Sequence, residues 1–377
     1  MRAASLMTIT AKKARRSDKT RRSPSPPTHH TPAPPEDAQS FFGFREKPFA
    51  LSPDPKFLFR GRSHGAAISS LVEGIHQLDG LITLTGDIGT GKTTLYRAVL
   101  EQMASNTHNA VLLDPLSTRE EFLKSLLVDF GVVGVEELGT DHLRNASRTE
   151  LSYVLRQFLA GQIKSRAAAI IVVDEAQNLT SALWEEIRIL TDTHSRETPV
   201  HVVLAGQPQL AVKLRQADME RMSQRISLRC TLEPLELDEI QGFISHRLAV
   251  AGAADAVEFS SEAIARIYAV SRGVPRLMTL LCDRTLHEAF LRRSQRIDVD
   301  MVEAGSARLG TPLPPTPGVG GFQRGDVSRE VNDWIVGLDD AVEQTPKAPL
   351  DTSSPRASRD WNQPHIPLLK RILGFPG

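Results

Sequence analysis

Short apolar runs alternate with amphipathic stretches through the middle of the chain. Four runs have the length of buried strands, and they are Leu81–Thr85, Val111–Leu113, Ala167–Val173 and Val200–Ala205. Between them, apolar residues recur with helical spacing, as in Thr93–Ala104 and Ser181–Thr193. This alternation is typical of an α/β domain with a mostly parallel sheet, and it predicts about five strands for residues 41–234.

The pattern changes after Pro234, where the strand-like runs end. Three amphipathic helices are predicted beyond it, at Leu237–Ala251, Ser260–Ser271 and Pro275–Arg293. We therefore expect residues 235–310 to form a small, all-helical lid domain.

Both ends of the chain have the composition of unfolded sequence. Residues 1–40 mix Lys and Arg with Ser, Thr and Pro, which predicts a disordered basic arm. We interpret it as a solvated tail, with contact to nucleic acid or anionic lipid as the alternative. Residues 311–377 begin as a Pro/Gly-rich linker and continue as a mostly disordered tail with short helix candidates at Val327–Val342 and Ile366–Leu373.

Charge and cysteine content narrow the class of protein. The chain has 45 basic and 45 acidic side chains, so net charge gives no reason to expect a polyanionic partner. Cys230 and Cys282 form no CxxC pair, which argues against a metal knuckle or a disulfide framework and favours a reducing cytosol. No apolar run approaches the roughly 18 residues that span a bilayer. In a secretory signal the basic residues come before the apolar stretch, whereas here the basic cluster follows Ala3–Ala11, so we expect no such signal. We expect a cytoplasmic protein without a membrane span.

The strongest chemical signal is Gly86–Thr93, which reads GDIGTGKT and satisfies GxxxxGK[ST] where a strand passes into a helix. Such a loop turns backbone N–H groups toward phosphates, with Lys92 at the β- and γ-phosphates and the Thr93 hydroxyl on Mg²⁺. A chance glycine-rich turn is the alternative, and the flanking strand and helix argue against it. ATP and Mg²⁺ are the expected cofactors, and the candidate nucleotide-binding residues are Gly86, Asp87, Ile88, Gly89, Thr90, Gly91, Lys92, Thr93 and Thr94.

A pair of acids follows another strand. Five buried-type residues, Ala169–Val173, lead into Asp174 and Glu175. We expect Asp174 to orient the metal together with Thr93, and Glu175 to polarise the water that attacks the γ-phosphate. The alternative is that this strand merely ends in solvated acids. The presence of the phosphate loop in the same chain argues against that alternative.

Other polar groups stand where they could complete such a site. Gln207 closes the run Val200–Ala205 and could hold the attacking water with Glu175. The segment Arg221–Arg229 is dense in arginine just before the next apolar run, and one of these side chains could act as an arginine finger from a neighbouring subunit. A solvated basic face is the competing interpretation, and the pattern leaves the choice among Arg221, Arg225 and Arg229 open. Arg276 opens a helix of the predicted lid and could reach the γ-phosphate.

Several short motifs occur together in a characteristic order. They are Phe42-Gly43-Phe44, Pro48-Phe49, Pro53-Asp54-Pro55, Asp174-Glu175-Ala176-Gln177-Asn178-Leu179, Ala205-Gly206-Gln207-Pro208, Gln224-Arg225-Ile226, His246-Arg247-Leu248 and Gly273-Val274-Pro275-Arg276. On these motifs, residues Phe41–Gly310 resemble the general secretion pathway protein A family, the ExeA-like AAA+ ATPases.

The resemblance carries specific implications. It implies an AAA+ core with a helical lid, sensor-one and sensor-two roles for Gln207 and Arg276, an arginine finger at Arg225, and assembly of identical subunits into a ring or filament. It also implies that Pro48–His64 helps enclose the adenine. Family members at the cell envelope often add a membrane span and a peptidoglycan-binding module, and neither is expected after Gly310 here.

Three functions are compatible with this sequence. The leading hypothesis is an AAA+ ATPase that drives assembly or remodelling of a secretion, pilus or exopolysaccharide export system, from the cytoplasm or from the periphery of the inner membrane. The first alternative is an ATP-dependent DNA-binding regulator of the transposition type, whose basic N-terminal arm contacts phosphates. The second is a nucleotide switch that scarcely turns over, and Glu175 argues against it.

Overall fold

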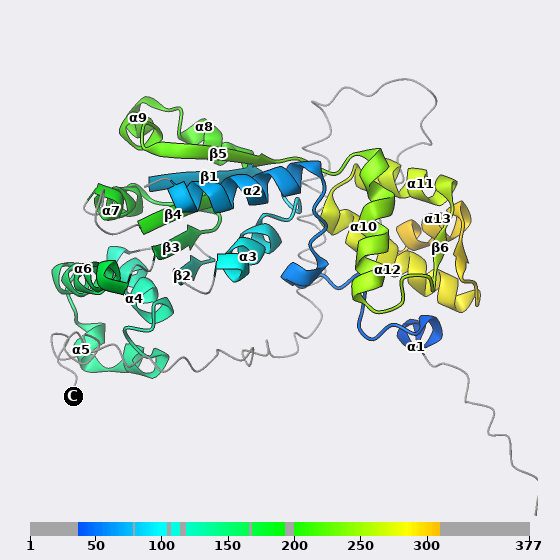
Figure 1. Cartoon of the computed structure of the whole chain (residues 1–377), viewed down its shortest axis with the longest axis horizontal. Coiled ribbons are helices and arrows are strands. Elements are labelled where there is room, and N and C mark those ends of the chain that lie inside the picture. Colours follow the sequence, from blue (N-terminus) through cyan, green and yellow to red (C-terminus); the bar gives the residue numbers. More distant parts are fainter. Residues whose placement is uncertain are drawn as a thin grey trace, which may run out of the picture. The chain divides into compact units, whose positions relative to one another are not determined.

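The computed structural model describes residues 37–77, 80–103, 107–113, 118–165, 168–192 and 200–309 (Figure 1). Nearly all of the predicted arm, up to residue 36, lies outside these ranges, and so do the predicted linker and tail of residues 311–377. Within the described ranges, none of the helices combines the length and apolar character needed to cross a bilayer.

The centre of the fold is a parallel sheet in the order β2-β3-β4-β1-β5. Its strands are β1 Gly80–Gly86, β2 Thr107–Leu112, β3 Ala168–Val173, β4 Val200–Gly206 and β5 Ile226–Leu232. The predicted sheet of five mostly parallel strands is confirmed. Because all strands run the same way, the residues that follow them gather at one edge of the sheet.

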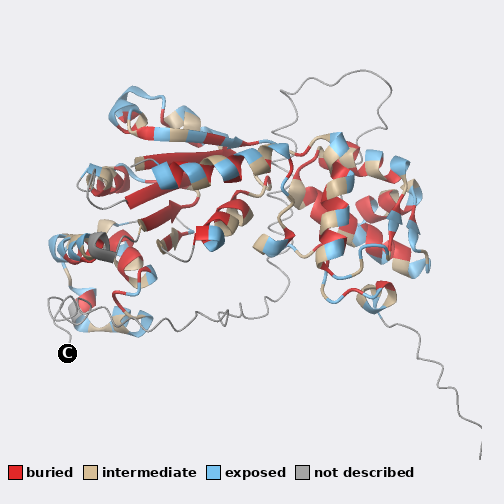
Figure 2. Ribbon diagram, viewed as in Figure 1, coloured by how far each residue is buried: buried red, intermediate tan, exposed pale blue. Residues whose placement is uncertain are grey.

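The three inner strands β3, β4 and β1 are buried on both faces, as in a parallel sheet covered by helices (Figure 2). Successive residues alternate between two apolar clusters, so that Leu81 and Ile171 belong to one while Ile82 and Ile170 belong to the other. The first cluster is completed by α4 Arg119–Asp129, α6 Arg148–Ser165 and α7 Ser181–Asp192, and the second by α2 Arg62–Gln77 and α3 Lys92–Met103. Short helical elements connect them: α5 Asp141–Arg144, α8 Pro208–Lys213, α9 Glu220–Ser223, η1 Pro55–Phe57, η3 Val135–Gly139, η4 Ala176–Asn178 and η5 Ala217–Met219.

The residues after Pro234 are mainly helical. They form α10 Leu237–Val250, α11 Ser261–Ser271, α12 Pro275–Leu291 and α13 Val299–Ala307 around a third apolar cluster. The expectation that strands end at Pro234 is wrong in one detail, because β6 Glu258–Phe259 pairs in parallel with β7 Arg296–Ile297. Two-residue strands are too short to produce a recognisable alternation of apolar and polar positions.

An N-terminal segment packs with these helices. It begins with α1 Ala38–Phe42, and Phe42, Phe44 and Phe49 lie in the third apolar cluster. The guanidinium of Arg247 donates from Nε to the carbonyl of Pro48 at 2.7 Å and from Nη2 to that of Ala50 at 2.8 Å. The predicted domain boundaries at residues 41, 235 and 310 stay predictions. Phe42, Phe44 and Phe49 were assigned to the nucleotide-binding domain, yet their side chains contribute to the apolar core of the C-terminal helices.

Candidate nucleotide-binding site

The phosphate loop Gly86–Thr93 connects β1 to the first turn of α3, the arrangement that the sequence predicts. The Lys92 ammonium lies inside the loop and donates to the carbonyls of Gly86 at 2.8 Å and Asp87 at 3.0 Å. The Thr90 hydroxyl donates to the same Asp87 carbonyl at 2.8 Å. The loop therefore already curves around a cation at the N-terminus of a helix, where an anion is stabilised by N–H groups and the helix dipole.

Burial of Lys92 affects its charge. Its side chain is almost fully enclosed, and this desolvation lowers the pKa of the ammonium, while Glu175, Asp174 and Asp87 act in the opposite direction. A polyphosphate bound in the loop would supply further negative charge and so favour the protonated form.

The N-terminus of α12 contacts the loop directly. The Arg276 N–H donates to the Gly89 carbonyl at 3.1 Å. Gly89 has a φ of +79°, and a Cβ atom there would lie 2.9 Å from the Cβ of Arg276. Only glycine combines this left-handed backbone with so close an approach. Arg276, the predicted sensor-two residue, thus starts from a backbone position fixed against the loop.

Asp174 lies where β3 ends and faces the first turn of α3. Its Oδ2 accepts from the Thr93 hydroxyl at 3.1 Å and from the Tyr96 hydroxyl at 2.9 Å. Burial, followed by the negative charge of Asp174, raises the pKa of Tyr96, so the phenol stays a hydrogen-bond donor. The structure therefore brings together the two side chains that the sequence proposes as metal ligands.

Glu175 follows in a left-handed backbone conformation with φ 48° and ψ 38°. Non-glycine residues adopt this region at a cost, and such residues cluster at functional sites. Its Oε2 accepts from the Gln177 amide at 2.5 Å and from the Gln207 amide at 3.3 Å. Gln207 in turn is placed by its own N–H, which donates to Oε1 of Gln177 at 3.1 Å. Two amides thus hold one carboxylate oxygen beside the phosphate loop.

The arginine-dense segment lies at the opposite end of the sheet. Ile226 pairs with Leu81 at the start of β1, so Arg225 stands about 20 Å from Gly86, six residues along the strand. The Arg225 guanidinium forms an ion pair with Asp192 at the end of α7. Arg229 lies within β5 and not before it, which corrects the expectation that the whole segment precedes the next strand, and its Nη2 donates to the Ser223 carbonyl at 3.0 Å.

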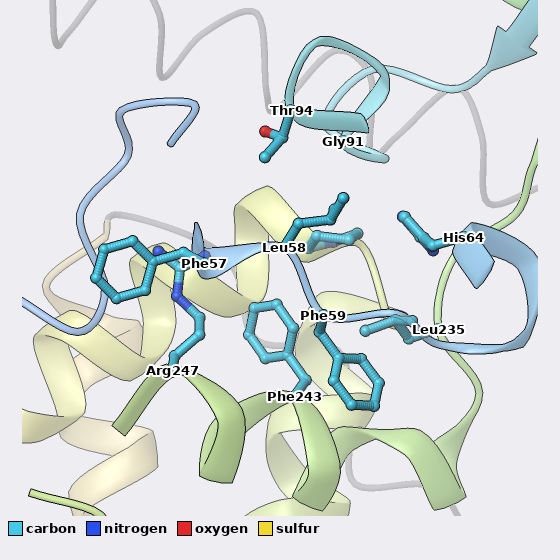
Figure 3. Close-up of a pocket in the computed structure, with 10 residues that line it drawn as sticks. Phe57, Leu58, Phe59, His64, Gly91, Thr94, Leu235, Phe243 and Arg247 are labelled. Carbon is cyan, nitrogen blue, oxygen red and sulfur yellow. The ribbon is translucent and has the colours of Figure 1, made fainter. Parts of the chain in front are cut away.

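A small hollow of about 50 Å³ lies beside the loop (Figure 3). Gly91 and Thr94 line it, and so do Phe57, Phe59 and Phe243. The other lining residues are Leu58, His64, Leu235, Arg247 and Pro275. Four of these ten residues belong to Pro48–His64, the segment proposed to enclose the adenine, and the hollow is mostly aromatic and aliphatic.

Three residues of this region were not assigned a role from the sequence. Tyr96 stands three positions after Thr93, a spacing that puts both on one helix face, so the signal was present. Gln177 falls inside a recognised motif, but its contact with Glu175 depends on the turn η4. The sequence placed His64 at the end of Pro48–His64 but did not indicate its contact with the loop, because its partner, the Thr90 carbonyl, is 26 positions away.

The donor set near the loop fits Mg²⁺. Thr93 offers a hydroxyl oxygen and Asp174 a carboxylate oxygen, the hard ligands that this ion prefers. In the described ranges, His, Cys, Asp and Glu side chains nowhere gather in groups of three that could hold a metal. A phosphate-bound Mg²⁺ does not need such a group, since phosphates and waters fill most of its coordination sphere.

Comparison with known proteins gives the class first. Residues 75–214 match the model of the AAA domain family, a stretch that runs from the end of α2 through the phosphate loop, the acids and Gln207. Fold and loop together define a P-loop protein of the AAA class, and the predicted fold class is confirmed.

The chain is also 36% identical over 258 residues to General secretion pathway protein A of Aeromonas hydrophila, an alignment that covers 68% of this chain and 46% of that protein. Over this stretch the chain is similar to the general secretion pathway protein A family, the resemblance that the motifs indicated. The chain spans about half the length of this relative.

Solved structures agree on the fold. The ORC2 protein of Aeropyrum pernix in ADPNP-ADP complexes is 16% identical with a TM-score of 0.55, over 70% of this chain and 71% of that one. Drosophila ORC bound to DNA is 18% identical with a TM-score of 0.50, over 77% of this chain and 71% of that one.

Proposed function

We propose that the protein binds Mg-ATP and hydrolyses it. The observation that carries this proposal is the position of Thr93, Asp174 and Glu175: the hydroxyl and the first carboxylate lie 3.1 Å apart, and the second carboxylate follows in the chain beside the loop. Membership of the AAA class supports the same conclusion.

Binding is the task of the loop. Its N–H groups and the Lys92 ammonium would neutralise the phosphates, and Lys92 would exchange the carbonyls of Gly86 and Asp87 for phosphate oxygens. Thr93 and Asp174 would hold Mg²⁺, which supplies Lewis-acid stabilisation of the phosphate charge when bound. The hollow bordered by Phe57, Phe59 and Thr94 would form part of the wall around the adenine.

Hydrolysis needs a water in line with the γ-phosphate. Glu175 would accept a proton from this water or orient it, and Gln207 would hold both the water and the carboxylate. The amide contacts at 2.5 and 3.3 Å keep Glu175 in one position while leaving its second oxygen for the water. Arg276 would add positive charge from the lid.

Completion of the site requires a second subunit. At about 20 Å along the sheet, Arg225 cannot reach the phosphate loop of its own chain. We propose that it acts as an arginine finger on a neighbouring copy, in a ring or filament of identical subunits. Arg221 and Arg229 are the other candidates.

The proposal for the biological target rests on the family resemblance. We propose that turnover drives assembly or remodelling of a secretion, pilus or exopolysaccharide export system, and that the protein works in the cytoplasm or at the periphery of the inner membrane. Support comes from the 36% identity to General secretion pathway protein A, over about half the length of that relative.

One assay tests the enzyme and sorts the targets. Purified protein is expected to release phosphate from ATP with Mg²⁺ and to stop when EDTA is added. Double-stranded DNA and anionic vesicles are added in separate reactions. ATP-dependent, salt-sensitive DNA binding with stimulated turnover would favour the DNA regulator over the export ATPase. ADP binding without turnover at any protein concentration would leave only a nucleotide switch.

A further inference from the structure

His64 is a buried side chain in contact with the phosphate loop, and the proposed hydrolysis step does not use it. It stands near the start of α2 and is 1% exposed. Its Nε2 lies 2.7 Å from the carbonyl oxygen of Thr90, inside the loop. Because a carbonyl can only accept, Nε2 carries the proton and donates.

This hydrogen bond determines which way one peptide group faces. In a trans peptide the C=O and the following N–H point in opposite directions. The Thr90 carbonyl points at α2, so the N–H of Gly91 points away from α2. Gly91 has a φ of +97°, a conformation that glycine adopts easily and leaves easily, so the peptide is not held by its own backbone preference.

We propose that His64 is a positioning residue, which holds the Thr90–Gly91 peptide so that the Gly91 N–H faces the phosphates of the nucleotide. The inference rests on the proposed nucleotide site and adds to it a side chain outside the loop. The His64 ring also lines the hollow proposed for the adenine, so the experiment has to separate its bond to the loop from any contact with the base.

The start of α2 is itself anchored, which makes His64 a firm support. The Arg62 N–H donates to Oε1 of Glu239 at 2.6 Å, and the Arg62 guanidinium holds Asp238 with two hydrogen bonds of 2.7 and 2.8 Å. Both acids are in the first turn of α10. Burial lowers the pKa of His64, which keeps the ring neutral with one N–H. Within the described chain, its Nδ1 has no hydrogen-bond partner, so a single bond fixes the ring.

Four variants of the full-length protein test the proposal by ADP affinity. His64→Leu removes the donor and keeps an apolar volume. His64→Gln places an amide N–H near the position of Nε2, whereas His64→Asn carries its amide one bond shorter, near Nδ1. His76→Leu, an exposed change at the other end of α2, is the matched control. Adenosine is measured beside ADP by displacement of a fluorescent ADP analogue, and thermal unfolding of the unliganded variants is recorded.

The expected result is a loss of ADP affinity of about tenfold or more for His64→Leu and His64→Asn, as for a lost hydrogen bond to a charged group. Adenosine affinity, which reports any contact of His64 with the base, should fall by much less than ADP affinity, and His64→Gln should recover most of the loss of ADP affinity. The proposal is overturned if His64→Leu binds ADP like the wild type, or if Gln and Asn weaken it equally, which would indicate packing alone. Should His64→Leu fail to fold, the Gln and Asn pair still decides. Failure of the wild type to bind ADP would instead refute the proposed function and leave the His64 contact unexplained.

Discussion

The two ends of the sheet differ in how much of the proposed ATPase site each one contains within a single chain. At the carboxyl end, Thr93 donates to Asp174 and Gln207 donates to Glu175, and carbonyls of the loop hold the Lys92 ammonium, all within one chain. At the amino end, Arg225, which we propose acts on the phosphates of a neighbouring subunit, is held by Asp192 within its own chain.

Because of this difference, we expect nucleotide binding and ATP hydrolysis to depend on different parts of the molecule. Groups that hold nucleotide, metal and water come from one subunit, so a single chain should bind ATP. The arginine comes from the far end of the sheet, so efficient hydrolysis should depend on assembly. Substitutions at the two ends should therefore respond differently to protein concentration.

The largest effect is expected for Lys92→Ala, which should abolish nucleotide binding at any protein concentration. It removes the ammonium that lies inside the loop and leaves the phosphates to the N–H groups. Equilibrium titration with ADP measures this. Lys124→Ala, at an ammonium that contacts only the Arg144 carbonyl among the hydrogen bonds identified, should bind like the wild type. Retained ADP affinity in Lys92→Ala would contradict the proposed site.

Arg225→Ala should lower turnover by about a thousandfold or more, but only where the protein is assembled. ATP affinity of the dilute protein should not change, because the guanidinium is remote from its own loop. Turnover measured across a range of protein concentrations, with Arg221→Ala and Arg229→Ala in parallel, identifies which arginine acts. Equal loss in a dilute monomer would argue against action on a neighbour.

Glu175→Gln should reduce turnover by about a hundredfold or more while ADP and ATP still bind. The amide cannot accept a proton from water, yet it has the shape of the carboxylate. Single-turnover hydrolysis and equilibrium binding separate the two effects, and Glu233→Gln, an exposed acid, serves as the control. Full hydrolysis by Glu175→Gln would show that another group activates the water.

The smallest effect is expected for Asp192→Asn. Asp192 forms ion pairs with both Arg225 and Arg188, all three side chains are about one-third exposed, and two such pairs together contribute about 0.4–2 kcal/mol. Urea denaturation should show a free energy of unfolding lowered by no more than that. Nucleotide affinity should be unchanged, and a loss of ADP binding would mean that the two ends of the sheet are coupled within one chain.

Local pattern predicted much of the site. The loop, the two acids and Gln207 each follow an apolar run of strand length, and parallel strands bring such residues to one edge. The loop and the acids contact each other as that reasoning requires. The roles of Gln177 and His64 could not be predicted from such local patterns. The contact of Gln177 with Glu175 depends on the left-handed backbone at Glu175, and the contact of His64 with Thr90 depends on how α2 packs against the loop.

The amino-acid sequence by itself determined the parallel sheet, the phosphate loop and the acids, because apolar spacing and a short glycine-rich motif are local properties. Tertiary structure decided the rest: that Phe42, Phe44 and Phe49 pack with the C-terminal helices, that α12 rests on Gly89, and that Arg225 stands at the far end of the sheet. These contacts join residues far apart in the chain, and their geometry depends on how the elements pack and not on the residues beside them in sequence.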